Sequence, residues 1–152
     1  MFNSFDWDQL VRAVVRLGAS IVLAGAVGWE RELRGRGAGL RTHILVALGC
    51  TAFMSLAMEL TGPGGVGEAT RVIQGVAAGV GFLGGGVILK MNDEHRVRGL
   101  TTAASIWATA ALGVVIGAGF LAFATVLALL MLAVLALLRR VEHRQRPPSE
   151  YP

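Results

Sequence analysis

The sequence predicts an all-α integral membrane protein with five transmembrane helices, the N-terminus outside and the C-terminus in the cytoplasm. Hydrophobic residues fill 54% of the 152 positions and charged residues only 16%, against roughly 25% charged residues in soluble domains. Mean hydropathy is +0.62, and the charges gather in short blocks that leave long stretches uncharged. Five of these stretches are long enough, or nearly so, to cross a hydrocarbon core about 30 Å thick.

The predicted spans follow one another closely along the chain. They cover residues 13–29, 43–60, 72–89, 101–116 and 120–138. A glycine- and proline-containing turn at 61–70 separates the second span from the third, and Gly-Ala-Gly at 117–119 separates the last two. The polar, proline-rich end indicates a membrane domain over 1–139 and a disordered cytoplasmic tail over 140–152.

The orientation follows from the distribution of basic residues. With five spans, eleven of the 14 Lys and Arg residues fall on one side, which the positive-inside rule makes cytoplasmic. They are Arg31, Arg34, Arg36, Arg41, Lys90, Arg96, Arg98, Arg139, Arg140, Arg144 and Arg146. Because this pattern also accounts for the net charge of +4, we expect no nucleic-acid binding.

Enzymatic chemistry finds little support in the residues. The single cysteine, Cys50, excludes an intrachain disulfide and a cysteine-based metal site. There is no Ser-His-Asp pattern, no H-E-x-x-H and no P-loop. We therefore expect no enzymatic activity and no cofactor. A bound Mg²⁺ ion is a separate possibility, which depends on the carboxylates described below.

A glycine-rich stretch, "GVGFLGGG" at 79–86, fits the dinucleotide fingerprint G-x-G-x-x-G. The fingerprint also needs a preceding strand and an acidic residue about twenty positions on, whereas position 100 is leucine. The repeated small-x-x-x-small spacing instead indicates close helix packing, with the third helix packing centrally. The alternative is a helix unwound at 84–86 to line a site. The predicted packing glycines are Gly75, Gly79, Gly81, Gly84, Gly85 and Gly86.

Polar residues gather at the predicted cytoplasmic ends of the spans. Glu30 and Glu32 offer hard oxygen ligands for Mg²⁺, although neighbouring arginines weaken cation binding. An ion-pair network, including Glu30 with Arg34 at i,i+4, explains the block equally well. Arg41 is expected to bind lipid phosphate or to pair with Glu30 from a neighbouring helix.

A second polar group opens the fourth span, where Thr101 or Thr102 can cap the helix and Ser105 faces inward. No carboxylate lies near the bilayer centre, which weighs against an ordinary secondary cation transporter. Glu59, near the outer end of the second span, is expected to pair with Arg71. The candidate polar or ion-site residues are Glu30, Arg31, Glu32, Arg41, Thr42, Arg71, Gln74, Arg98, Thr101, Thr102 and Ser105.

Three stretches together resemble the MgtC/SapB family of bacterial inner-membrane proteins. They are "GWERELRGRGAGLRTHILVALG" (28–49), "TRVIQGVAAGVGFLGGGVILK" (70–90) and "VRGLTTAASIWATAALGVVIG" (97–117). The resemblance implies family roles for residues of all three motifs. They are Glu30, Arg31, Glu32, Gly39, Leu40, Arg41 and Thr42 in the first, Arg71, Gln74, Gly79, Gly81, Phe82, Leu83, Gly84 and Gly86 in the second, and Arg98, Gly99, Leu100, Thr101, Thr102, Ala103 and Ala104 in the third. Gly85 departs from the alanine that family members often carry, and the chain resembles a short form without the soluble C-terminal domain.

The resemblance also implies two functions. The family is linked to magnesium limitation and, in pathogens, to survival inside host cells. One function is ion transport or homeostasis, with Glu30, Arg41, Gln74 and the 101–105 hydroxyls converging on a polar site. The other is a non-transporting regulator that binds membrane complexes such as the ATP synthase by helix packing. The expected partners are the lipid bilayer, a second copy in a homodimer, and another membrane protein.

Overall fold

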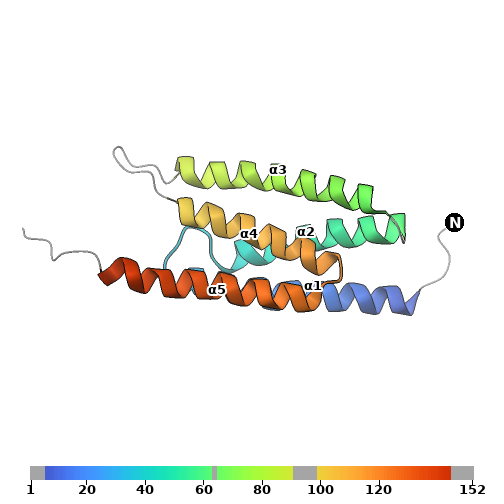
Figure 1. Ribbon diagram of the computed structural model, residues 1–152, viewed down its shortest axis with the longest axis horizontal. Coiled ribbons are helices and arrows are strands. Elements are labelled where there is room, and N and C mark those ends of the chain that lie inside the picture. Colours follow the sequence, from blue (N-terminus) through green and yellow to red (C-terminus); the bar gives the residue numbers. More distant parts are fainter. Residues whose placement is uncertain (1–5, 63–64, 91–98, 145–152) are drawn as a thin grey trace, which may run out of the picture.

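The computed structural model describes residues 6–62, 65–90 and 99–144 and folds them into five α-helices (Figure 1). The helices are α1 (Trp7–Leu33), α2 (Leu40–Thr61), α3 (Val66–Lys90), α4 (Leu100–Gly117) and α5 (Leu121–Arg144). Four of them are long and apolar enough to cross a membrane, and α5 contributes a shorter apolar stretch, Leu121–Leu137. The predicted class, a helical membrane protein, is confirmed, whereas the orientation stays a prediction.

The helices extend beyond the predicted spans at most of their ends. Helix α1 begins at Trp7, with Asp6 as its N-cap accepting a hydrogen bond from the Asp8 amide. Helix α5 continues to Arg144, so residues 140–144 of the predicted tail are helical, and 145–152 lie outside the described residues. Polar helix ends lack the hydropathy that marks a span, which explains why the apolar pattern gave shorter segments.

Helix α4 occupies the centre of the bundle, because it packs against all four other helices (Figure 1). Of its 18-residue apolar window 61% is buried, against 11% for α3. In the described chain α3 contacts only α2 and α4. The prediction that the glycine-rich third helix packs centrally is therefore wrong.

Two glycines of α4 bring it against α2. A Cβ on Gly113 would lie 2.5 Å from the Ala47 carbonyl oxygen, and one on Gly117 would lie 2.7 Å from the Met54 Cβ. Across the same contact, the Thr51 hydroxyl donates a hydrogen bond of 3.0 Å to the Gly113 carbonyl. Gly113-x-x-x-Gly117 is thus the small-x-x-x-small pair that allows close approach inside this chain.

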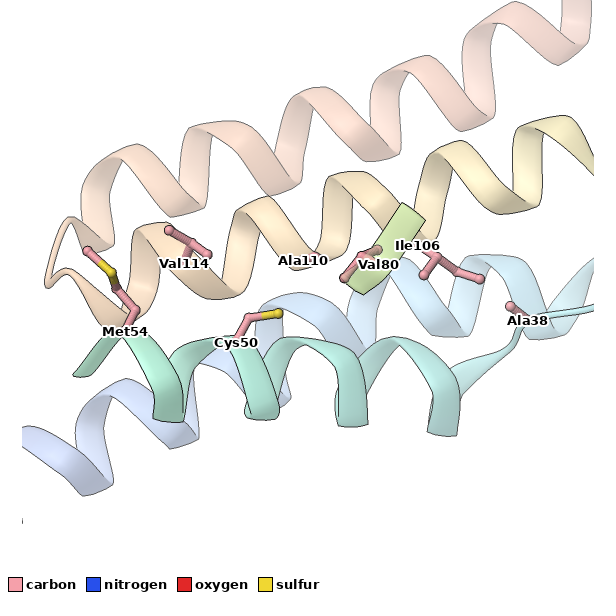
Figure 2. Close-up of a cluster of buried hydrophobic side chains, with 7 residues drawn as sticks. All are labelled: Ala38, Cys50, Met54, Val80, Ile106, Ala110 and Val114. Carbon is pink, nitrogen blue, oxygen red and sulfur yellow. The ribbon is translucent and has the colours of Figure 1, made fainter. Parts of the chain in front are cut away.

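Apolar side chains fill the space around this contact. Figure 2 shows Cys50 and Met54 of α2, Ile106 and Val114 of α4, and Val80 of α3 in one buried cluster. A second cluster joins α1, α2, α4 and α5 and is formed by Ala24, Ala47, Leu112, Ile116, Ala124 and Ala128. Alanines dominate this second cluster, so the helices can pack closely there.

Helix α3 stays helical through residues 84–86, so it is not unwound there. Gly84 faces α4, where an added Cβ would lie 3.5 Å from the Ala103 Cβ. The other five predicted packing glycines have open space at the Cβ position: Gly75, Gly79, Gly81, Gly85 and Gly86. Their role in packing stays a prediction, and it concerns a surface that the described chain leaves uncovered.

Candidate functional site: the inner polar cluster

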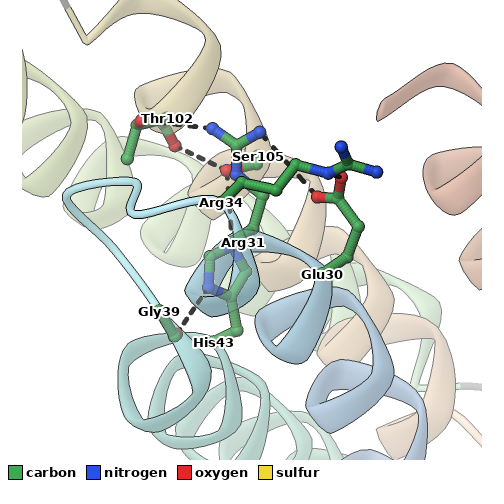
Figure 3. A network of polar contacts seen from close by, with 7 residues as sticks. All are labelled: Glu30, Arg31, Arg34, Gly39, His43, Thr102 and Ser105. Atoms are coloured by element: carbon green, nitrogen blue, oxygen red, sulfur yellow. Dashed lines mark hydrogen bonds and ion pairs between the residues drawn. The ribbon is translucent and has the colours of Figure 1, made fainter. Parts of the chain in front are cut away.

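A buried polar cluster lies where α1 ends and where α2 and α4 begin, at the predicted cytoplasmic end (Figure 3). We call it the inner polar cluster, and its members are Glu30, Arg31, Arg34, His43, Thr102 and Ser105. Arg31, His43, Thr102 and Ser105 are buried, whereas Glu30 is half-buried and Arg34 lies exposed at the edge. Arg31 is only 3% exposed, and its Nη2 donates to the Thr102 hydroxyl oxygen at 3.3 Å. This contact ties the end of α1 to the first turn of α4.

His43 connects α2 to the same turn of α4 and is fully buried. Its Nδ1 lies 2.9 Å from the Gly39 carbonyl oxygen and its Nε2 lies 3.3 Å from the Ser105 hydroxyl (Figure 3). Because a carbonyl only accepts, Nδ1 must carry a proton. The Ser105 hydroxyl has one proton to donate and two acceptors within reach, the neutral His43 Nε2 and the Thr102 carbonyl at 2.8 Å.

Two glycines allow this arrangement of α1 and α2. A Cβ on Gly28 would lie 2.8 Å from the Leu40 Cα, so the absence of a side chain lets the helices approach. A Cβ on Gly39 would overlap the Glu32 carboxylate, so glycine at this position leaves room for that side chain. Glu32 Oε2 accepts a hydrogen bond of 3.0 Å from the Leu40 amide, so this carboxylate stabilises the N-terminus of α2.

Glu30 supplies the negative charge of the cluster. It pairs with Arg34, which confirms the predicted i,i+4 contact, and its Oε2 lies 4.0 Å from Arg31 Nη1. Within the described residues, Glu30 Oε2 and Arg31 Nε are buried without a hydrogen-bond partner.

The surroundings of these carboxylates oppose a Mg²⁺ site. Glu30 faces two guanidinium groups, whose charge repels a cation, and one oxygen of Glu32 accepts the Leu40 amide. Across the described ranges, no group of three or more His, Cys, Asp or Glu side chains could hold a metal ion.

The expected convergence of Glu30, Arg41, Gln74 and Thr102 is met only in part. Glu30 and Thr102 both contact Arg31, whereas Arg41 is exposed and forms no hydrogen bond or ion pair with another described residue. Gln74 is exposed on α3, about 15 Å along the helix from Gly84 at 1.5 Å per residue. Gly84 marks the level of α4 next to Thr102, so Gln74 lies well away from the cluster.

The remaining candidate site residues are partly exposed and partly buried. Thr42 and Thr101 are exposed, and Arg98 lies outside the described residues. Neither Thr101 nor Thr102 caps α4. The N-cap residue is Gly99, whose φ of 90° places it in the left-handed region, and no side chain caps the helix. The predicted cap is therefore wrong, whereas Ser105 does face inward and is buried.

The predicted Glu59–Arg71 pair is also wrong. Arg71 pairs with Glu68, three residues earlier on α3, at 2.9 Å. Glu59 instead approaches α1, where Arg12 Nε lies 3.5 Å from its Oε1 and Gln9 donates to its Oε2 at 3.4 Å. The short loop between α2 and α3 therefore does not bring those two charges together.

Sequence reasoning missed His43 as a member of the cluster. Its signal was periodic: His43, Ala47, Cys50, Thr51 and Met54 form the buried face of α2 at helical spacing. A histidine on such a face must find buried partners, and here these are Gly39 and Ser105.

Fold and site together define a multi-pass helical membrane protein whose first, second and fourth helices are joined at one end by a buried arginine–histidine–hydroxyl cluster. The model of the MgtC family matches residues 17–144, and the chain belongs to that family.

Several curated proteins are similar to this chain. "Protein MgtC" of Brucella abortus (strain 2308) is 41% identical over 88% of this chain and 54% of its own length. "Putative magnesium transporter YhiD" of Escherichia coli (strain K12) is 42% identical over 80% of this chain and 59% of its own length. "Protein SrpB" of Synechococcus elongatus is 44% identical over 75% of this chain and 66% of its own length. The matched region thus spans little more than half of the MgtC and YhiD relatives, and no solved structure matches the chain.

Proposed function

We propose that this chain is a magnesium-linked regulator in the bacterial inner membrane, acting by packing its α3 against a transmembrane helix of another membrane protein. The magnesium link is supported by the relative named as a putative magnesium transporter and by membership of the MgtC family. The observation that carries the packing mechanism is the set of five glycines on α3 whose Cβ positions meet open space.

Glycine inside a helix costs stability, about 0.5–1 kcal/mol relative to alanine at each position. A Cβ on Gly84 would make an ordinary van der Waals contact with Ala103 of α4, at 3.5 Å from its Cβ. For Gly75, Gly79, Gly81, Gly85 and Gly86 the described chain offers no such contact. A surface facing lipid gains nothing from glycine, whereas a second helix can approach such a surface closely.

A groove beside these glycines supports the same proposal. It has a volume of about 570 Å³, lies between α2 and α3, and is lined almost entirely by apolar atoms. Gly75, Gly79 and Leu83 form part of its α3 wall, and Leu45 and Phe53 part of its α2 wall. Phe53 is 64% exposed and Leu45 68% exposed, so large side chains stand beside the small ones, as knobs beside a hole.

The inner polar cluster supports a regulator more than a conduit. Its groups bond to one another between α1, α2 and α4, and none of them lines the groove. Ser105 also lines a separate pocket between α4 and α5. The pocket beside Ser105 has a volume of about 340 Å³ and otherwise contains alanines, aliphatic residues and one threonine. A buried arginine at the centre also repels a divalent cation.

Purified chain in proteoliposomes is expected to give no Mg²⁺ flux above protein-free liposomes, because no carboxylate pathway crosses the described bundle. A Mg²⁺-sensitive dye inside the vesicles, with an imposed Mg²⁺ gradient, measures this. Flux by the wild type that disappears in Glu30→Ala would contradict the regulator and support transport instead.

The Gly79→Leu variant is expected not to restore growth of a gene-deleted strain at limiting Mg²⁺, whereas the wild-type chain restores it. The reason is that the leucine fills the groove that the partner helix enters. The matched control is Gly67→Leu, which places the same side chain in open space on the first turn of α3, outside the groove. The control is expected to grow as the wild type does, with both variants folded by circular dichroism.

A photo-crosslinking residue at Leu83 identifies the occupant, because this position lines the groove and is 49% exposed. We expect an adduct with a different membrane protein that is lost in Gly79→Leu. An adduct at twice the mass of the chain would show that the groove is occupied by a second copy of this chain instead of a different protein. Wild-type growth of Gly79→Leu would refute the packing mechanism altogether.

Ion transport is the second candidate function. It is favoured by the buried Glu30 Oε2, which accepts no hydrogen bond within the described chain, and by the name of the E. coli relative. In that case Glu30→Ala and Arg41→Ala would both abolish flux, since these residues belong to the polar site that the sequence predicts.

A further inference from the structure

A second polar site lies at the opposite end of the bundle, where a pocket of about 280 Å³ opens between α1 and α2. It is separate from the inner polar cluster and from the groove beside α3. Its lining includes Gln9 and Arg16 of α1 and Ser55 and Glu59 of α2, together with small and aliphatic side chains. Unlike the groove beside α3 and the pocket beside Ser105, it is lined by two charged residues, Arg16 and Glu59.

Arg16 has no carboxylate partner in this pocket. Glu59 faces Arg12 at 3.5 Å and accepts a hydrogen bond from Gln9 at 3.4 Å. Arg16 forms no hydrogen bond or ion pair with another described residue. Its guanidinium is therefore the charged group of the lining that no described side chain engages.

The position of Arg16 makes an unpaired charge costly. It is the fourth residue of the span predicted over 13–29, and it is half-buried. Ionisable residues within a membrane span normally have a partner or mark a ligand site. The guanidinium lies beside the α4–α5 turn, where a Cβ on Gly119 would lie 3.2 Å from Arg16 Nη2.

The Arg16 guanidinium is the group in this pocket that suits an anion with several oxygens. The Ser55 hydroxyl also lines the pocket, but it donates its one proton to the Gly117 carbonyl at 3.2 Å and so offers an anion no hydrogen bond in this arrangement. Guanidinium groups bind phosphate oxygens in bidentate fashion, and apolar walls strengthen such a contact by excluding water. The walls here are mainly Ala13, Leu17, Ala52 and Leu56.

We propose that this outer pocket binds a phosphate group through Arg16, in a site independent of the partner helix on α3. The phosphate belongs either to a phospholipid headgroup, which reaches the pocket from the bilayer, or to a free phosphate ion. Both sources present the same chemistry to the guanidinium, and the experiment separates them.

Native mass spectrometry of the full chain in detergent, titrated with phosphatidylglycerol, tests the proposal. We expect the wild type to retain one lipid and Arg16→Gln to bind it at least about tenfold more weakly, the usual effect of losing a charge-assisted hydrogen bond. Arg71→Gln is the matched control, since it removes an arginine that is 76% exposed and paired on α3, outside the pocket. It is expected to bind within about twofold of the wild type.

Two further arms make the result specific. Ala13→Leu fills the pocket while keeping Arg16, so it must also weaken binding, and this variant serves if Arg16→Gln does not fold. If inorganic phosphate displaces the lipid, the site takes the phosphate ion itself. If inorganic phosphate does not compete, the site holds a headgroup together with its acyl chains. Either outcome supports the proposal when lipid binding depends on Arg16. Equal lipid binding by wild type, Arg16→Gln and Ala13→Leu, or no binding of either probe by the wild type, would overturn it.

Discussion

Gly113→Ala is expected to lower the free energy of unfolding by about 3 kcal/mol, at the upper end of the usual cost of overpacking. The added Cβ would lie 2.5 Å from the Ala47 carbonyl oxygen, 2.8 Å from the Cys50 Cβ and 3.0 Å from the Ala47 Cα. Two of these atoms belong to the α2 backbone, so the methyl group cannot be accommodated by rotating a side chain. The helices must separate, and that weakens the Thr51–Gly113 hydrogen bond at the same turn.

Thermal unfolding in detergent, followed by circular dichroism, measures this effect. Gly49→Ala is the matched control, because Gly49 lies on α2 with nothing within 4 Å of its Cβ position. There the change is expected to raise stability by about 0.5–1 kcal/mol, the helix propensity gained when alanine replaces glycine. Equal stabilities of the two variants would mean that α2 and α4 do not approach each other as closely as the structure shows.

The contrast among glycines shows how far the sequence alone could predict this fold. Hydropathy placed five helices correctly, because a run of apolar residues long enough for a bilayer has few alternatives. Spacing could not rank the glycine pairs, since Gly75–Gly79 and Gly113–Gly117 share the same pattern. The ranking depends on which helix lies opposite, and that is a property of tertiary packing: α4 lies at the centre and α3 at the edge.

The inner polar cluster could be predicted in part for the same reason. Glu30 and Arg34 are neighbours on one helix turn, so local spacing was sufficient. Arg31 and Thr102 lie 71 residues apart, and only the packing of α1 against α4 joins them. Glu32 was expected as a metal ligand or an ion pair, whereas the fold turns its carboxylate back to the start of α2, a contact that depends on the path of residues 34–39.

Glu30→Gln is expected to destabilise the chain by about 3 kcal/mol, because it leaves the buried Arg31 charge without a carboxylate among the described residues. The substitution keeps the shape of the side chain, so the loss reports on charge rather than on packing. The Arg31 side chain is 4% exposed and that of Glu30 is 12% exposed, so water screens the pair weakly. The same thermal unfolding measurement provides the value.

Glu68→Gln provides the matched control for this change. Glu68 and Arg71 also lie on one helix, but their side chains are 52% and 76% exposed, so loss of that pair is expected to cost no more than about 1 kcal/mol. The double variant Glu30→Gln/Arg31→Met must then be less destabilised than the sum of its two single variants, since methionine removes the charge that Glu30 compensates. Additive losses would show that the two side chains act independently, and Arg31 would then be held by Thr102 and its apolar surroundings alone. A positive coupling, together with a small effect of Glu68→Gln, would make the buried charge pair the element that fixes the end of α1 against α4.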